Sequence, residues 1–119
     1  MPYIRFGLLG IVLLLAGCQT APMIGDDFEG RQLKDGVYKG SYTKGPNSAV
    51  VKVTVVDSRI EDVELVRHFS SWKGSKANKV IPERIKAQQS TRVDAVSGAT
   101  NSSIVIMNAA QKAIEQAYE

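Results

Sequence analysis

The chain has 119 residues, of which 44% are hydrophobic and 23% are charged, the balance of an ordinary globular protein with one domain. Its formal net charge of +3 is small and its basic residues are spread along the chain, which gives no case for a nucleic-acid-binding protein, since such a protein needs a clustered basic face. The single cysteine excludes an intramolecular disulfide and a multi-cysteine metal site.

The first residues have the composition of a secretion signal. Arg5 supplies a positive start, and the apolar run over residues 6–15 is shorter than the roughly 20 residues that a membrane-spanning helix needs. The run ends in LAGC, residues 15–18, which resembles the bacterial lipobox, in which the cysteine becomes the lipidated N-terminus. We therefore expect a lipoprotein signal peptide over residues 1–17 and a lipid anchor on Cys18. The alternative is an ordinary signal peptide with an incidental cysteine.

A lipid on Cys18 would place the mature chain outside the cytoplasm, at the periplasmic face of a membrane in a Gram-negative bacterium. Several acyl chains bury enough methylene groups for a durable anchor. Cleavage would remove Arg5 and lower the net charge from +3 to +2. Residues 18–34 are polar, acidic and glycine-containing without a steady hydrophobic period, and we expect them to form a flexible tether of about 20–25 Å.

Three strands are predicted after the tether. Residues 36–43 alternate and are rich in β-formers, residues 49–56 carry valines on one face, and residues 59–69 follow a tight turn. Short connections between the three favour an antiparallel meander. The apolar residues of the third strand do not keep strict alternation, which predicts a β-bulge near Asp62.

Two helices are predicted in the second half of the domain. Residues 80–89 form the first, with Pro82 in its first turn, where proline is tolerated. A short extended piece at residues 90–93 precedes the second helix, at about residues 102–117. One apolar face of that helix carries Ile104, Met107, Ala110, Ile114 and Ala117. The order β-β-β-α-(β)-α predicts an α+β domain over residues 35–119, with both helices packed on the antiparallel sheet.

Side chains of catalytic type are scarce in this sequence. His68 is the single histidine, and it lies at the end of a predicted strand, where we interpret it as a solvated or structural residue. The sequence has no Walker loop, no dinucleotide fingerprint and no recognisable catalytic triad. A hydrolase or a metalloenzyme is therefore disfavoured.

The stretch VDAVSGATNSS, residues 93–103, is the chemically distinctive feature. It is a turn of small residues and hydroxyls that leads into a helix N-terminus, where unpaired N–H groups and the helix dipole favour a phosphate. Gly98 and Ala99 keep the approach open, and Asn101, Ser102 or Ser103 can cap the helix. The residues alone leave two interpretations: a phosphate site beside several hydroxyls, or a helix cap without a ligand.

The same stretch resembles the D-x-x-S-G-A-T flavinylation motif of FMN-binding domains, here running from Asp94 to Thr100. Such domains occur in the C subunit of the sodium-translocating NADH:quinone reductase, in the G subunit of the Rnf complex and in many small extracytoplasmic proteins. DGVYKG, residues 35–40, is similar to the opening strand of the family, and residues 51–63 are similar to its pair of valine-rich strands. The similarity therefore extends over nearly all of residues 35–119.

The resemblance implies that Thr100 carries FMN through a phosphoester bond to its hydroxyl, made by a separate magnesium-dependent FAD:protein FMN transferase. A threonine hydroxyl is a weak nucleophile and no histidine lies near it in sequence, so an external enzyme is a sensible requirement. Asp94 would either help the transferase to recognise the turn or hydrogen-bond the backbone of the turn. The implied cofactor-binding set is Thr100, Asp94, Ser97, Gly98, Ala99, Ser102 and Ser103.

The function we expect is that of a lipid-anchored, extracytoplasmic electron-transfer flavoprotein. Its partners would be the transferase and redox proteins in or near the membrane, and it would be a redox carrier rather than an enzyme with its own substrate. One alternative is a module that binds FMN or another phosphorylated ligand noncovalently. The other is a structural lipoprotein without a cofactor.

The contacts of the flavin ring are the least determined part of this expectation. Many quinone-reductase-type members carry an acidic "E-T" segment after the third strand, where this chain has HFSSWKG at residues 68–74. Candidates to pack on the ring, or else ordinary aromatic residues, are Trp72, Tyr38 and Tyr42. Candidates to pair with the phosphate or the ring oxygens, or else solvated charges, are Lys73, Lys76, Lys79 and Arg84.

Overall fold

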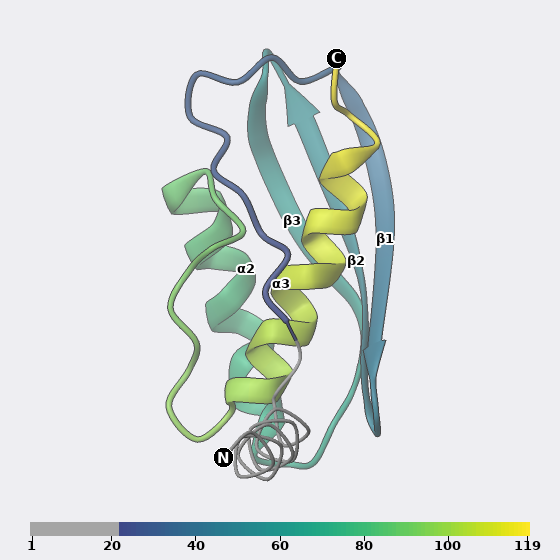
Figure 1. Cartoon of the computed structure of the whole chain (residues 1–119), viewed down its shortest axis with the longest axis vertical. Helices are drawn as coiled ribbons and strands as arrows, with labels where there is room; N and C mark the ends of the chain where they lie inside the picture. Colours follow the sequence, from purple (N-terminus) through teal and green to yellow (C-terminus); the bar gives the residue numbers. More distant parts are fainter. Residues whose placement is uncertain (1–21) are drawn as a thin grey trace, which may run out of the picture.

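The domain consists of a three-stranded sheet with two helices on one of its faces (Figure 1). The computed structural model describes residues 22–119, so the predicted signal peptide and Cys18 lie outside the described residues. The elements are β1 (Gly36–Lys44), β2 (Asn47–Val56), β3 (Arg59–Phe69), the 3-10 turn η1 (Gly74–Lys76), α2 (Ala77–Gln88) and α3 (Thr100–Glu115). Both strand pairs are antiparallel, in the order β1-β2-β3. The predicted α+β class and the strand meander are confirmed.

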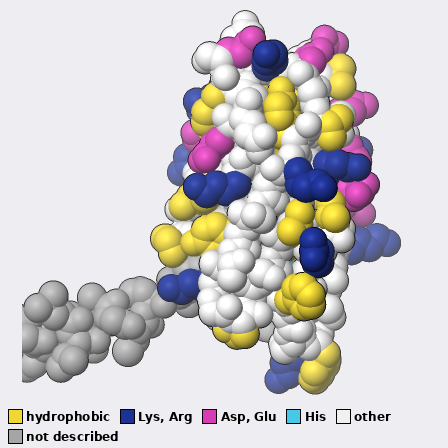
Figure 2. All heavy atoms as spheres, turned by 90° about the vertical axis from the view of Figure 1, so that its right-hand side faces the viewer, with side chains coloured by type: hydrophobic (Ala, Val, Ile, Leu, Met, Phe, Trp, Pro, Cys, Tyr) yellow, Lys and Arg dark blue, Asp and Glu magenta, His cyan; other side chains and the backbone are white. Residues whose placement is uncertain are grey.

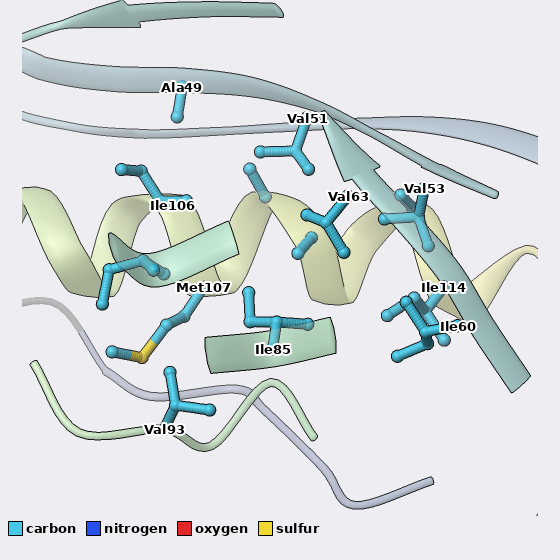
Figure 3. Close-up of a cluster of buried hydrophobic side chains, with 14 of the residues drawn as sticks. Ala49, Val51, Val53, Ile60, Val63, Ile85, Val93, Ile106, Met107 and Ile114 are labelled. Atoms are coloured by element: carbon cyan, nitrogen blue, oxygen red, sulfur yellow. The ribbon is translucent and has the colours of Figure 1, made fainter. Parts of the chain in front are cut away.

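The core lies between the sheet and the helices. Alternate residues of β2 point toward α3, and Val51, Val53 and Val55 are at most 1% exposed. Figure 3 shows Val51 and Val53 on one side of α3, with Met107 projecting from the other side of that helix toward the preceding loop. The alternation that predicted this strand is therefore the pattern by which it buries one face.

The second helix is more deeply buried than a single apolar face would require. Twelve of the sixteen residues of α3 are buried, because the sheet covers one side of the helix and α2 and the N-terminal segment cover others (Figure 1). Gly40 of β1 allows the closest approach, since a Cβ at this position would collide with the backbone of α3 at Ala109 and Ala113. Small residues on both elements therefore set the distance between sheet and helix.

Two β-bulges interrupt the pairing of β2 with β3. Glu61 is the extra residue of the first, which lies beside Asp62, where the sequence predicted a bulge. Val66 is the extra residue of a second bulge that was not predicted. The adjacent apolar residues Leu65 and Val66 conceal this break in the alternation, because either of them could face the core.

The first helix begins earlier than predicted. α2 begins at Ala77 and not at Val80, because η1 leads directly into it and the polar residues there give no apolar signal. The prediction that Pro82 lies in the first turn is therefore wrong: Pro82 is the sixth residue of the helix, inside it and buried. Gln89 ends the helix in a left-handed conformation, with φ of 51°.

Residues 22–34, which we call the N-terminal strap, lie along the helices (Figure 1). Phe28 and Leu33 are 1% and 2% exposed, so these residues belong to the core and not to a flexible tether as expected. Two isolated apolar residues in an acidic, glycine-containing stretch form no period, which is why the sequence did not reveal the packing. Within residues 22–119, no helix is both long and apolar enough to cross a membrane.

Hydrogen bonds fix the strap along its length. Asn108 of α3, fully buried, donates from Nδ2 to the carbonyl of Pro22 at 2.7 Å and accepts the N–H of Ile24 at Oδ1, 3.2 Å away. Asp27 forms an isolated bridge with Ser90. This bridge is the only β-pairing that residues 90–93, predicted to be extended, make within residues 22–119. The folded unit therefore includes residues before the predicted boundary at residue 35.

Candidate functional site

The stretch before α3 forms a tight turn with an open outer side. The N–H of Ala99 donates to the carbonyl of Val96 at 2.9 Å, and Gly98 has a φ of 82°, which glycine adopts without a steric penalty. A Cβ at Gly98 would meet no atom within 4 Å. α3 then begins at Thr100, two residues earlier than predicted, with Ala99 as its N-cap.

Ser103 fastens this turn to the helix. Its Oγ donates to the carbonyl of Ala99 at 2.7 Å and accepts the N–H of Val96 at 3.0 Å. The prediction that Ser102 or Ser103 caps the helix is wrong, because both lie inside its first turn and are buried. Ser102 instead packs against Gly74 of η1, where a side chain would collide with its hydroxyl.

The absence of a side-chain cap leaves the N-terminus of α3 free to receive an anion. Among the described residues, the backbone N–H groups of Thr100, Asn101 and Ser102 have no hydrogen-bond partner, and no side chain caps the helix. Thr100 and Asn101 are exposed, so these groups can be reached from solvent. Free N–H groups at the positive end of a sixteen-residue helix form a favourable site for a phosphate.

An open pocket of about 380 Å³ lies in front of this terminus. Three separate segments supply its lining: Asn47; Ser71 and Gly74; and Gly98, Ala99, Thr100, Asn101 and Ser102. All of these residues are small or polar, which suits a phosphate and sugar hydroxyls better than an aromatic ring. The motif predicted the third segment, whereas the first two reach the pocket through tertiary structure and gave no signal in the sequence.

The acidic residue of the motif lies outside the pocket. Asp94 is exposed, and its carboxylate forms no hydrogen bond or ion pair within the described part of the chain. Its backbone carbonyl accepts a hydrogen bond of 2.6 Å from Nη1 of Arg84, which ties the turn to α2. Of the two roles considered for Asp94, hydrogen bonding to the backbone of the turn is thus not seen. Ser97 is also exposed and does not line the pocket.

The candidate ring contacts are not all brought to the pocket. Tyr38 is a structural residue, because its hydroxyl donates to the carbonyl of Lys34 at 2.7 Å and its ring packs on the core. Tyr42 likewise packs against the core. Trp72 is 75% exposed and directly follows Ser71 of the pocket lining. It is therefore the remaining aromatic candidate beside Thr100.

A larger groove lies elsewhere, between β3 and α2, with a volume of about 610 Å³. It contains neither Thr100 nor any other hydroxyl or thiol, and its charged lining consists of three carboxylates and two lysines. Near the end of β3, Nδ1 of His68 forms a hydrogen bond of 2.5 Å with the amide oxygen of Asn78. Its Nε2 is buried and has no hydrogen-bond partner in the described region. No group of three potential metal ligands occurs within residues 22–119. We therefore assign the candidate site to the pocket at Thr100.

The fold and the site together define a small α+β domain in which the last helix presents free N–H groups and a threonine hydroxyl to a polar pocket. The sequence model of the FMN-binding domain family matches residues 31–115. The chain therefore belongs to this family, as its resemblance predicted, and carries an FMN-binding domain. The match begins inside the strap, in agreement with the burial of Leu33.

Two similar proteins place this chain among its relatives. An uncharacterised protein of Treponema pallidum is 36% identical over 90 residues, which are 71% of this chain and 24% of that protein. This chain thus spans about a quarter of the length of that relative. The crystal structure of the CPE2226 protein from Clostridium perfringens aligns with a TM-score of 0.58 and 21% identity, over 71% of this chain and 88% of that one. At this identity the likeness concerns the fold alone.

The pocket fits the ribityl phosphate end of FMN. The free N–H groups of α3 can bind phosphate oxygens, and the amide of Asn47 and the hydroxyl of Ser71 can bind ribityl hydroxyls. Gly74 lets Ser70 and Ser102 pack closely behind the lining, since a Cβ at this position would collide with both. The lining offers no apolar wall for the isoalloxazine ring, which would extend beyond the pocket toward solvent or Trp72.

Proposed function

We propose that this domain is an electron carrier that holds FMN as a phosphoester on Thr100. The observation that carries the proposal is the position of this hydroxyl: Thr100 is exposed, lines the pocket and is the first residue of a helix with free N–H groups. Bound FMN would supply reversible electron transfer, while the protein supplies position and environment.

The other hydroxyls of the motif are poorer acceptors. Ser102 and Ser103 are 4% and 0% exposed, and the oxygen of Ser103 is engaged in two hydrogen bonds. Ser97 lies outside the pocket. Ser71 is the competing exposed hydroxyl in the lining, and its oxygen is oriented toward the N–H of Gly74, 3.4 Å away. Thr100 therefore combines exposure, freedom and proximity to the helix terminus.

An FAD:protein FMN transferase would make the bond. The Oγ of Thr100 would attack the phosphorus of the FMN half, the pyrophosphate bond of FAD would break, and AMP would leave with the hydroxyl proton passing to a base of the transferase. The N–H groups of α3 would stabilise the phosphate, and Ser103 would hold the turn in place. The carboxylate of Asp94, which is exposed and has no partner among residues 22–119, suits recognition by the transferase.

We further propose that the domain works outside the cytoplasm, held to a membrane by a lipid on Cys18. The support is the LAGC sequence at residues 15–18 and the apolar run before it. In that compartment a noncovalent flavin that dissociates is diluted, and its occupancy falls with the free concentration. A covalent bond removes this dependence. The partners would be redox proteins in or near the membrane.

Intact-mass measurement tests the attachment. After co-expression with a transferase, the mass should rise by that of FMN minus one water, and Thr100→Ala should abolish the rise. Ser71→Ala tests the competing acceptor: it removes the other exposed hydroxyl of the pocket, and with Thr100 as the attachment point the same mass increase should be reached at completion of the reaction. Flavin that is lost on denaturation and filtration would instead favour the noncovalent module. An unmodified, colourless wild type would contradict flavin attachment and favour a structural lipoprotein.

A further inference from the structure

The end of the domain that carries Thr100 is uniformly basic. Residues 44–48, 69–79 and 97–101, which we call the site pole, meet around the pocket. The pole contains four exposed lysines and none of the 12 acidic residues of the chain. Figure 2 shows acidic side chains on the upper part of one face, and basic and hydrophobic side chains without acidic ones at the lower end of that face.

Large exposed aromatic side chains accompany these lysines. Trp72 is 75% exposed and Phe69 is 60% exposed, although neither ring is needed for the core. Lys73 directly follows Trp72, with its Nζ 5.8 Å from the centroid of the ring, and Lys76 lies three residues further on. Neither lysine forms an ion pair among the described residues. Tryptophan beside lysine is the combination that settles at the headgroup level of an anionic bilayer.

The strap begins on the same half of the domain. Pro22 is bound by Asn108, eight residues after Thr100, and so lies about 12 Å along α3 from the pole. From there the strap runs away from the pole toward the opposite end (Figure 1). The opposite end carries the exposed acidic residues Asp35 and Asp57.

The chain between Pro22 and Cys18 is short. Four residue steps can span at most about 14 Å, so a lipid on Cys18 would hold Pro22 within roughly that distance of the bilayer surface. The longer tether expected from the sequence is therefore not available, because the strap is bound to the domain. Contact of the site pole with the bilayer satisfies this reach and matches opposite charges. The opposite end has mixed charge, because Lys34 and Arg59 lie there beside Asp35 and Asp57, and it offers no such match to an anionic surface.

We propose that the site pole docks on the anionic surface of the membrane that holds the anchor. This rests on the proposed lipid at Cys18 and is independent of FMN attachment. Trp72 enters the headgroup region, and the lysines of the pole face anionic lipid. Thr100, and any flavin on it, then lies at the membrane surface, where membrane-embedded redox proteins expose their extracytoplasmic sides.

The fluorescence of Trp72, the only tryptophan of the chain, reports the docking directly. The mature lipoprotein without flavin, its lipid verified by mass, is reconstituted in vesicles of phosphatidylglycerol and phosphatidylcholine or of phosphatidylcholine alone. In anionic vesicles we expect a blue-shifted emission, a several-fold loss of acrylamide quenching and new quenching by brominated lipid, all reversed by salt. The neutral vesicles should show none of these changes.

Charge reversal provides the matched comparison. Lys73→Glu with Lys76→Glu should abolish the blue shift, whereas Lys34→Glu with Lys39→Glu makes the same change of net charge outside the pole and should retain it. Equal loss in both double variants would overturn the proposal. A lipidated wild type in which acrylamide quenches Trp72 as strongly with anionic vesicles as without them would also overturn the proposal. That result would favour an acidic protein as the partner of the pole. A chain without lipid would refute the anchor and this docking together, while the mass test on Thr100 would still stand.

Discussion

Replacing Ser103 by alanine tests whether this side chain builds the turn that presents Thr100. The substitution removes two hydrogen bonds, at 2.7 Å to the carbonyl of Ala99 and at 3.0 Å from the N–H of Val96. The Val96 N–H would lose its partner in a partly buried position, at a cost of about 1–3 kcal/mol. Alanine is a better helix former than serine by about 0.5 kcal/mol. The net loss of stability should therefore be about 1–2 kcal/mol.

Thermal unfolding measures this loss. For a domain of this size, 1 kcal/mol corresponds to a fall in Tm of about 4–8 °C. Amide hydrogen exchange should also accelerate at Val96, and the rate of flavin attachment at Thr100 should fall, because the turn before it is no longer fastened. Ser97→Ala is the control: its hydroxyl is exposed and forms no hydrogen bond among the described residues. If Ser103→Ala matched this control in Tm and in exchange at Val96, the proposed role of Ser103 would be refuted.

Two further substitutions test the packing and the strap. Gly40→Ala should destabilise the domain by about 3 kcal/mol in chemical denaturation, because its Cβ would collide with the backbone of α3. Ser41→Ala, at the neighbouring exposed position, is the control. A loss of stability in Gly40→Ala no larger than in this control would contradict the packing. Asp26 accepts the N–H of Asp27 and pairs with Arg31, and these contacts, the backbone bond first, hold the pKa of Asp26 below its ordinary value of 3.8. Its stabilising contribution is therefore present above that value and is lost as the pH falls through the lowered pKa. Asp26→Asn should have a lower Tm than wild type at neutral pH, and the gap should close in acid below 3.8; a gap independent of pH would refute the contribution of the charge.

The strands could be predicted because their burial follows a local period. Alternate valines in β2 face the core, and the broken alternation near Asp62 marked a real bulge. Both helices were predicted to start later than they do. α2 directly continues the 3-10 turn η1, and α3 begins without a side-chain cap, so neither start carries the usual capping residue. The burial of Phe28 was not predictable, because it depends on residues distant in sequence: its N–H donates to the carbonyl of Gln89, and its ring lies 6.4 Å from that of Tyr118.

The site divides in the same way. The motif located Thr100 and the open turn at Gly98, because these depend on residues that are consecutive in the chain. The start of β2 and the end of β3 lie at the same end of the sheet, and this brings Asn47, Ser71 and Gly74 to the pocket. No local pattern marks them. The two buried serines were assigned the wrong role because the helix started earlier, which moved them from the cap into its first turn.

The proposed membrane docking constrains the order of events at Thr100. The proposed transferase would need access to the exposed hydroxyl and to Asp94, which lie on or beside the pole that would face the lipid. One surface cannot contact both at once, so FMN must be attached either before docking or while the pole is released. Release is feasible because attraction between surface lysines and anionic lipid is weakened by salt. The lipid on Cys18 would keep the domain at the membrane during release, and the bound strap would return the same pole to the surface. Covalent attachment of the flavin suits this cycle, because the cofactor cannot be lost in the intervals when the pocket is open to solvent.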